Sequence, residues 1–240
     1  SGALLLLGMG AAFWMNAFAA GPWMVLAGFA CWLWSLRATF AAAPGACAFR
    51  RPDPAALIVV AAGGVVLLAH EAFGFKIVMD ELMLLGTSMS MHLDRVVLTP
   101  LRGNDIQGAF EIIEGVVDKR PLFFPFLLSV VHDLAGYRPE NAFGLNVILT
   151  LVLLGLTWEL GRRLAGRTGG ALGVVLLAGL PLLGQNATGG GFELLNLVMI
   201  LATLLLGVRF TERSNGASLA AFIFSAVLLA QVRYESVVFL

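Results

Sequence analysis

The sequence predicts an all-α polytopic membrane protein, and its composition and hydropathy carry that prediction. Of its 240 residues, 59% are hydrophobic and only 12% are charged, and the mean hydropathy is +0.90. A water-soluble chain of this length would need more charge to cover its surface. Glycine is abundant, with 28 residues, and small residues let helix backbones approach one another closely in lipid.

Apolar runs of nearly the length that a membrane requires recur along the chain. A helix needs about 20 apolar residues to cross the hydrocarbon core. Gly21-Pro22 predicts a tight turn, so residues 1–54 are expected to form a two-span hairpin ahead of a core over residues 55–240. A further apolar run closes the sequence, and we expect this core to be incomplete at its C-terminus. The predicted spans are residues 3–20, 22–43, 55–73, 142–160, 168–185, 194–208 and 217–232.

The segment 75–141 interrupts these spans and is dense in polar residues. We expect three amphipathic helices in it: residues 80–93, a second that begins after Asn104, and a third from Pro121 to Gly136. Asn104 suits an N-cap because apolar residues recur at intervals of three and four after it. The third helix is only about 22 Å long at 1.5 Å per residue, too short to cross about 30 Å of hydrocarbon. The three helices are therefore expected to lie at the membrane interface.

The arginines predict which side of the membrane this segment faces. Lys and Arg in short loops mark the cytoplasm, and simple alternation of the spans places eight arginines on one side. The short turns on the other side carry no basic residue. We therefore expect a cytoplasmic N-terminus and an outward segment 75–141, facing a periplasm, a lumen or the cell exterior. The eight are Arg37, Arg50, Arg51, Arg162, Arg163, Arg167, Arg209 and Arg213.

Two adjacent carboxylates, Asp80 and Glu81, stand just beyond a predicted span. A carboxylate held beside low-dielectric material is a candidate general base. The same pair also suits the first turn of a helix, where the helix dipole favours negative charge. Spacing alone leaves both interpretations open.

Cations occur at two further places in the outward regions. Lys119 and Arg120 precede a helix whose free N–H groups also favour anions, so they form a candidate phosphate site; a solvated pair is the alternative. Arg233 lies at the outer end of a span, although basic residues gather on the cytoplasmic side, so its position there needs a specific reason. Pairing with Glu235 or with Asp80 would be a sufficient structural one.

Other polar residues have two interpretations each. Glu193 follows a glycine-rich turn and could bind a substrate hydroxyl or cap its helix. His132 and Asp133 could form an acid–base pair, although adjacent helical residues point apart and a solvated polar face is the alternative. The sequence has no phosphate-binding glycine loop, zinc-type cluster, GxSxG or nucleic-acid module. We expect no nucleic acid partner, and a group donor used on the outer face would have to come from the lipid.

The order of these pieces resembles the GT-C membrane glycosyltransferases, and most of all the branch of protein O-mannosyltransferases and aminoarabinose transferases. The resemblance extends from about residue 55 to the end of the chain. Two departures are that Leu122 stands where relatives have a second proline, and that Glu193 follows Gly-Gly-Gly-Phe. The matching pieces are Asp80-Glu81, Lys119-Arg-Pro-Leu-Phe-Phe-Pro125, Leu134-Ala-Gly136, Gly161-Arg-Arg-Leu-Ala-Gly166, Glu193 and Arg233-Tyr-Glu235.

The resemblance implies a GT-C-like helix bundle that moves a sugar from a polyprenyl-phosphate donor to an acceptor hydroxyl on the outer face, with inversion. The acceptor would be a lipid, a glycan or a protein. Asp80 would act as the catalytic base, with Glu81 as its neighbour. Some GT-C enzymes place a divalent metal beside the acidic pair, and a metal remains open here. The remaining expected roles are donor phosphate binding by Lys119, Arg120 and Arg233, and acceptor or substrate binding by Glu193, Glu235 and His132.

Two other functions compete with a transferase. A multi-span transporter would want charged or broken segments inside spans, at matching positions of two halves, whereas these spans are nearly free of charge. A non-catalytic membrane scaffold would use the outward segment only to bind a partner. The expected location is the inner (plasma) membrane of a bacterium, among membrane lipids, with the active site facing the periplasm or exterior.

Overall fold

A computed structural model describes residues 11–41, 53–118 and 120–239, and most of these are helical. Three helices in this part of the chain are long and apolar enough to cross a membrane: residues 19–41 of α2, α6 and α8. The helices are α2 (Ala11–Ala41), α3 (Pro54–Ala69), α4 (Val78–Leu93), α5 (Phe123–Ala135), α6 (Asn141–Ala178), α7 (Pro181–Ala187), α8 (Glu193–Glu212), α9 (Gly216–Ala230) and the 3-10 helix η1 (Tyr234–Phe239).

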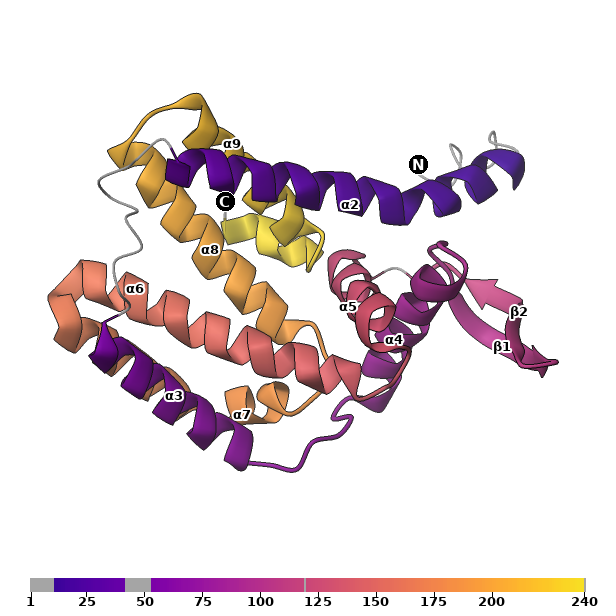
Figure 1. Cartoon of the computed structure of the whole chain (residues 1–240), viewed down its shortest axis with the longest axis horizontal. Coiled ribbons are helices and arrows are strands. Elements are labelled where there is room, and N and C mark those ends of the chain that lie inside the picture. Colours follow the sequence, from indigo (N-terminus) through magenta and orange to yellow (C-terminus); the bar gives the residue numbers. More distant parts are fainter. Residues whose placement is uncertain (1–10, 42–52, 119, 240) are drawn as a thin grey trace.

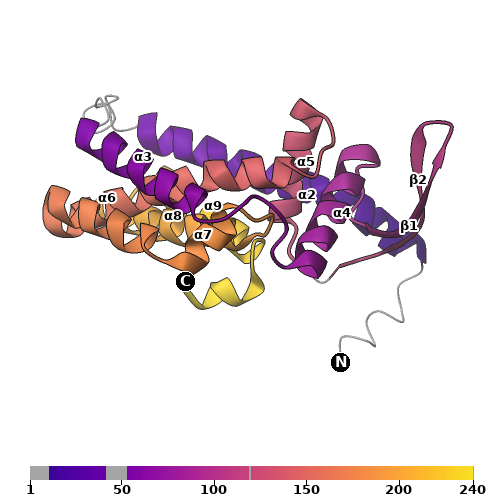
Figure 2. The same cartoon turned by 90° about the horizontal axis from the view of Figure 1, so that it is seen from below.

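Helix α6 lies at the centre of the bundle, between α3 and α8, and α9 packs on both α8 and α2 (Figure 1). Leu67 of α3, Leu154 of α6 and Leu194 of α8 are fully buried there, because apolar helices gain packing only by excluding lipid from shared faces. The amphipathic helices α4 and α5 pack together at one end of the bundle (Figure 2).

The first span of α6 turns back on itself where a basic turn was predicted. Ala165 and Gly166 have non-helical dihedral angles, and Gly166 has a φ of 67°, which glycine adopts without steric cost. The two legs then meet backbone to backbone. A Cβ on Gly161 would lie only 2.4 Å from the carbonyl oxygen of Gly169. The predicted turn at residues 162–167 is confirmed.

Gly161→Ala is expected to destabilise the protein by about 1–3 kcal/mol, the usual cost of overpacking. The added methyl group meets rigid backbone, so the two legs of α6 must move apart. Gly144→Ala is the matched control, since a Cβ there meets no atom within 4 Å and alanine favours a helix by up to about 1 kcal/mol over glycine. Thermal unfolding in detergent measures both. Equal midpoints for the two variants would contradict the close contact.

The tight turn predicted at Gly21-Pro22 is wrong, because α2 continues through it with Pro22 inside the helix. Membrane helices tolerate proline where neighbouring groups compensate for the lost hydrogen bond. Gly21 also packs against Val97 at the polar end of the bundle, whereas Thr39 lies beside Arg209 at the other end. Helix α2 therefore runs from one end of the bundle to the other as one helix. The described residues 11–41 do not form the predicted two-span hairpin, and the cytoplasmic N-terminus inferred from it stays a prediction.

The second predicted amphipathic helix is wrong, whereas the predicted helical class is confirmed in its coarse form, since the described chain is mostly helical. Strands β1 (Thr99–Ile106) and β2 (Ala109–Val116) form an antiparallel hairpin in place of that helix. Gln107 and Gly108 connect them, with φ of 55° and 84°, the left-handed pair that tight hairpins favour. The backbone N–H of Gly108 donates to Asp105 Oδ1 at 2.8 Å. β-branched residues at alternate as well as helical spacing made the pattern ambiguous.

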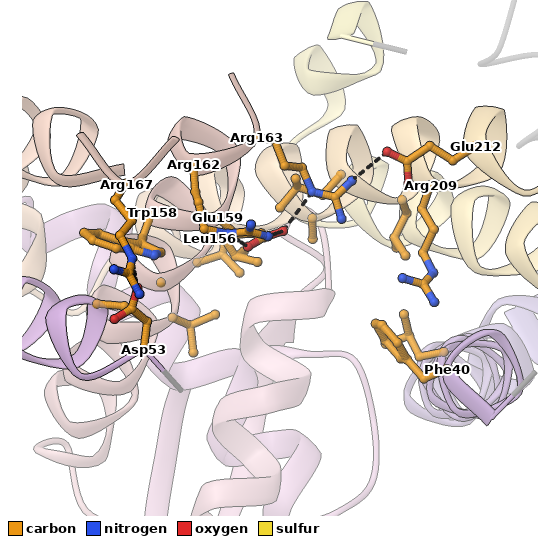
Figure 3. A pocket seen from close by; sticks show the side chains of 18 of the residues that line it. Phe40, Asp53, Leu156, Trp158, Glu159, Arg162, Arg163, Arg167, Arg209 and Glu212 are labelled. Atoms are coloured by element: carbon orange, nitrogen blue, oxygen red, sulfur yellow. Dashed lines mark hydrogen bonds and ion pairs between the residues drawn. The ribbon is translucent and has the colours of Figure 1, made fainter. Parts of the chain in front are cut away.

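Five arginines of the predicted cytoplasmic side line one groove at one end of the bundle (Figure 3), namely Arg162, Arg163, Arg167, Arg209 and Arg213. Helix α8 begins at the other end, beside the polar segment, and its 20 residues span about 30 Å, the thickness of a bilayer core. The chain thus has an arginine-rich end and a carboxylate-rich end. Arg50 and Arg51 lie outside the described residues, as does Lys119.

Candidate active site

Five charged side chains from four parts of the chain form the candidate site at the end opposite the arginines. We call them the carboxylate–arginine cluster. Each comes from an element end or a connecting segment, which is where a helical scaffold can present polar groups. The members are Asp80 and Glu81 in the first turn of α4, Arg120 in the segment before α5, Glu193 at the start of α8 and Arg233 after α9.

Asp80 is held by Arg120. The guanidinium donates to Asp80 Oδ1 through Nη2 and to Asp118 Oδ2 through Nη1, the latter at 2.7 Å. The Arg120 side chain is 18% exposed and that of Asp80 is 46% exposed. Burial opposes the charge of Arg120, but the two carboxylates raise its pKa overall. The arginine is therefore sheltered, while its carboxylate partner stays open to a substrate.

Glu81, in contrast, is buried. Its Oε2 accepts a hydrogen bond from the backbone N–H of Lys76 at 3.0 Å, and its Oε1 faces Gly189. The ammonium group of Lys76 points elsewhere, to Glu71 at 2.9 Å. Glu81 thus ties the segment before α4 to the glycine-rich loop before α8, and it leaves Asp80 as the accessible member of the pair.

Glu193 is positioned by a loop of glycines at residues 189–191. Its Oε2 folds back over Gly191, where a Cβ would lie 2.2 Å from it, so a larger residue at 191 would displace this carboxylate. Asn146 anchors this loop from α6, because its Nδ2 donates to the carbonyl oxygens of Gly189 at 2.8 Å and Gly191 at 3.0 Å. Sequence reasoning missed Asn146, although a polar residue inside an apolar span is a signal for such a role.

Contacts between segments bring the members of the cluster together. Glu81 and Glu193 face the same glycine loop, at Gly189 and Gly191, and Ser236 donates to Asn196 Oδ1 at 2.6 Å, which places the segment of Arg233 beside the start of α8. Arg233 is about half exposed, and its Nε donates to Glu235 Oε2 at 3.3 Å. The pairing expected with Glu235 is confirmed. A hydrogen bond from its own backbone and the charge of Arg233 lower the pKa of the Glu235 carboxyl.

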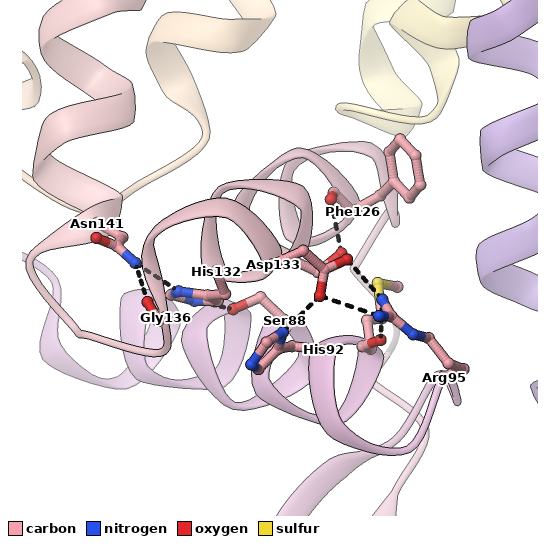
Figure 4. A network of polar contacts seen from close by, with 10 residues as sticks. Ser88, His92, Arg95, Phe126, His132, Asp133, Gly136 and Asn141 are labelled. Atoms are coloured by element: carbon pink, nitrogen blue, oxygen red, sulfur yellow. Dashed lines mark hydrogen bonds and ion pairs between the residues drawn. The ribbon is translucent and has the colours of Figure 1, made fainter.

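His132 lies apart from this cluster, between α4 and α5 (Figure 4). It is completely buried, so the solvated polar face expected for it is wrong. Asn141 Nδ2 donates to its Nδ1 at 2.9 Å, and its Nε2 lies 3.2 Å from Ser88 Oγ. Asn141 also donates to Gly136 at 2.8 Å, which fixes the amide orientation. His132 therefore holds a proton on Nε2 and joins the two amphipathic helices.

Asp133 does not bond to His132. It accepts from His92 at 2.6 Å and from Arg95 at 2.7 Å and 3.0 Å. Burial opposes its charge, but the hydrogen bonds from Arg95 and His92 lower the pKa of Asp133 overall. His132 and Asp133 thus both link α5 to α4, and the interaction between the helices depends on a neutral histidine beside an ionised carboxylate.

The stability of the protein is expected to fall as the pH drops from about 6.5 to about 4. Burial and the charge of His92 lower the pKa of His132 from 6.5 to about 4, despite the opposing charge of Asp133. In this pH range the His132 imidazole is protonated in the unfolded chain but stays neutral in the folded protein. Folding is therefore favoured by high pH. The full loss is about 3 kcal/mol.

Denaturation midpoints in detergent at pH 7.5 and pH 5 test this expectation. His132→Gln should flatten the pH dependence, because glutamine does not titrate. His70→Gln, at an exposed position, should keep it. A wild-type midpoint that is the same at both pH values would contradict the expectation.

The described residues of the candidate site do not form a ligand set for a divalent metal ion. Among the described residues, no group of three or more His, Cys, Asp or Glu side chains lies close enough together to hold a metal ion. Asp80 and Glu81 point to different partners, Arg120 and Lys76. The chemistry considered below therefore uses only the side chains of the cluster.

Comparison with known proteins identifies the family. The family model described as dolichyl-phosphate-mannose-protein mannosyltransferase matches residues 119–240, just over half of the chain. No curated protein and no solved structure matches the chain. The matched region holds Arg120, Glu193 and Arg233, and Asp80 lies outside it. The chain therefore belongs to the dolichyl-phosphate-mannose-protein mannosyltransferase family and is a membrane glycosyltransferase of the GT-C type.

Proposed function

We propose that this protein transfers a sugar from a polyprenyl-phosphate-linked donor to an acceptor hydroxyl at the carboxylate-rich end of the bundle, with inversion at the anomeric carbon. The observations that carry the proposal are the contact of Asp80 with Arg120 and the position of Glu193 on the glycine loop that Glu81 also faces. A hydrogen bond from Ser236 to Asn196 brings the segment of Arg233 beside the start of α8. A base, a hydroxyl ligand and a cation are the three groups that such a transfer needs.

Asp80 acts as the general base. Arg120 occupies Oδ1, which leaves Oδ2 to accept the proton of the acceptor hydroxyl. As that proton leaves, the hydroxyl oxygen forms a bond to the anomeric carbon. The bond from this carbon to the phosphate oxygen breaks, and the lipid phosphate departs with the electron pair. Displacement from the opposite face inverts the anomeric centre.

Arg233 binds the departing phosphate. Its guanidinium is about half exposed and has only an exposed carboxylate, Glu235, as its partner in the described part of the chain. A charge-assisted hydrogen bond to a phosphate oxygen is stronger than a contact with a solvated carboxylate. Arg120 has two carboxylate partners already, so we assign it the orientation of Asp80 and a secondary place in phosphate binding.

Glu193 and Glu235 are proposed to bind sugar or acceptor hydroxyls, and Glu81 fixes the loops around them. His132 is left out of the site because both of its ring nitrogens are already engaged. The donor is a lipid because the site lies at the end of the spans. The arginines at the other end favour an extracytoplasmic site.

A donor assay tests this function. Membranes that contain the protein are incubated with synthetic polyprenyl-phosphate sugars, and released polyprenyl phosphate is measured against sugar incorporated into lipid, glycan and protein fractions. We expect the two quantities to be equal and the product linkage to be inverted. Release from a nucleotide sugar instead, or retention of configuration, would overturn the proposal.

A further inference from the structure

A second candidate site lies at the arginine-rich end, about 30 Å along α8 from the carboxylate–arginine cluster. It is a half-open groove of about 1180 Å³ between α2, α3, α6 and α8 (Figure 3). We call it the basic groove. Its inner walls are apolar, with Leu36, Val152, Leu156 and Val198, and arginines form its rim. No step of the proposed transfer uses it.

The rim has more arginines than carboxylates among the described residues that line it. Arg162 and Arg163 share Glu159, Arg163 also reaches Glu212 at 3.2 Å, and Arg167 binds Asp53 at 2.7 Å. Those pairs use all three carboxylates that line the groove. The two other lining arginines, Arg209 and Arg213, form no ion pair within the described residues. A ligand with negative charge would complement them.

Two buried donors on residues that line the groove also have no acceptor in the part of the chain that the structure describes. Arg209 stacks over Phe40 at 4.7 Å and has a weak contact with Thr39 O at 3.4 Å, but its Nε has no partner. Trp32 Nε1 has none either, and both atoms are out of contact with solvent. A buried donor without an acceptor is unfavourable, so a bound ligand that supplied acceptor atoms would stabilise this arrangement.

The spacing of the two donors indicates the kind of ligand. Trp32 precedes Thr39, the contact of Arg209, by seven residues of α2, so it lies about 10 Å deeper in the bundle. In a glycerophospholipid, ester carbonyl oxygens lie below the phosphate, and the acyl chains follow. Tryptophan N–H groups typically donate at this level of a membrane.

We propose that the basic groove binds one anionic glycerophospholipid. Its phosphate accepts from Arg209 beside Arg213, an ester carbonyl accepts from Trp32 Nε1, and an acyl chain lies along Leu36 and Leu156. A soluble phosphate would leave the Trp32 donor and the apolar walls uncovered. A polyprenyl phosphate has no ester carbonyl for Trp32.

Native mass spectrometry of the protein in detergent tests this site, with phosphatidylglycerol as the probe. We expect one lipid per chain to bind more tightly than the rest, and more tightly than phosphatidylcholine. Arg209→Gln should weaken that first binding by about tenfold or more, as expected for a bond to a charged group. Trp32→Phe keeps the ring and should weaken it by about three- to tenfold.

Two matched controls separate the groove from general effects. Arg37→Gln removes an exposed arginine at the same end of α2, and Trp34→Phe changes an indole that is 76% exposed. Neither lines the groove, so both variants should bind like the wild type. The ether-linked analogue lacks the ester carbonyl and should bind the wild type more weakly than phosphatidylglycerol does. Its affinity should be the same for Trp32→Phe as for the wild type.

Several results would overturn the proposal. Equal lipid binding in Arg209→Gln and Arg37→Gln would show that the groove is not the site. Competition by glycerol 3-phosphate at equal concentration would indicate a soluble anion. Stronger first binding of polyprenyl phosphate than of phosphatidylglycerol would indicate a prenyl lipid. If Arg209→Gln fails to fold, Trp32→Phe and its ether-lipid comparison decide the question.

Discussion

Asp80→Asn is expected to lower kcat/KM for sugar transfer by about 10²- to 10⁴-fold, the contribution of a general base. Asparagine keeps the shape of the side chain and an oxygen for Arg120, so the segment before α5 stays in place. It cannot accept the proton of the acceptor hydroxyl. Binding of the donor lipid should be nearly unchanged, because Arg233 is intact.

Asp94→Asn is the matched control, since Asp94 is an exposed residue that ends the same helix α4. Both variants are assayed for turnover and for donor binding. A scaffold or a transporter has no need of a base, so unchanged activity in Asp80→Asn would refute the transferase site. A loss confined to donor binding would instead make Asp80 a ligand for the lipid.

Asp118→Asn separates the role of Arg120 from that of Asp80. Asp118 touches Arg120 and is largely buried, so its loss acts on the base only through the arginine. We expect kcat to fall by roughly tenfold, about 1.4 kcal/mol, with KM for the donor unchanged. A rise in KM with constant kcat would place Arg120 mainly on the donor phosphate.

The sequence predicted the parts of this fold that depend on apolar length and on turn residues. Such local signals predicted the α6 turn and a helix over residues 121–136, which is observed as Phe123–Ala135 with Gly136 as its C-cap. They also placed the arginines that line the basic groove at one common end. The Gly21-Pro22 turn failed because proline ends helices in water but is tolerated inside a membrane helix. The β-hairpin was missed because β-branched residues fitted both periods.

The charged residues of the candidate site were predicted from the sequence, but the residue that anchors its glycine loop was not. Charge stands out in a sequence that is mostly apolar, so Asp80, Arg120, Glu193 and Arg233 were identifiable. The sequence did not show which of these residues contact one another, because such contacts join residues 40 or more positions apart in the sequence, as in the pair of Arg120 with Asp80. Asn146 was missed because its role depends on two backbone carbonyls of a distant loop, which no side-chain pattern reveals.

Asn146→Leu is expected to destabilise the protein by about 2–5 kcal/mol. The substitution keeps the volume of the side chain but leaves the carbonyl groups of Gly189 and Gly191 buried without a donor, at about 1–3 kcal/mol each. Because that loop carries Glu193, sugar transfer should also fall at temperatures where the variant is still folded. Thermal unfolding in detergent and the donor assay measure the two effects.

Asn186→Leu makes the same exchange in α7, just before the same glycine loop. Among the described residues its Nδ2 bonds only to Leu182 O, within an exposed turn of α7, at 3.0 Å, so stability should change by less than about 0.5 kcal/mol. The comparison therefore isolates the two buried hydrogen bonds from the general effect of an added leucine. If both variants unfolded at the same temperature, Asn146 would not anchor the loop, and the position of Glu193 would need another cause. Lost stability with full transfer would show that Glu193 is not required for the reaction, whereas loss of both ties the loop to the site.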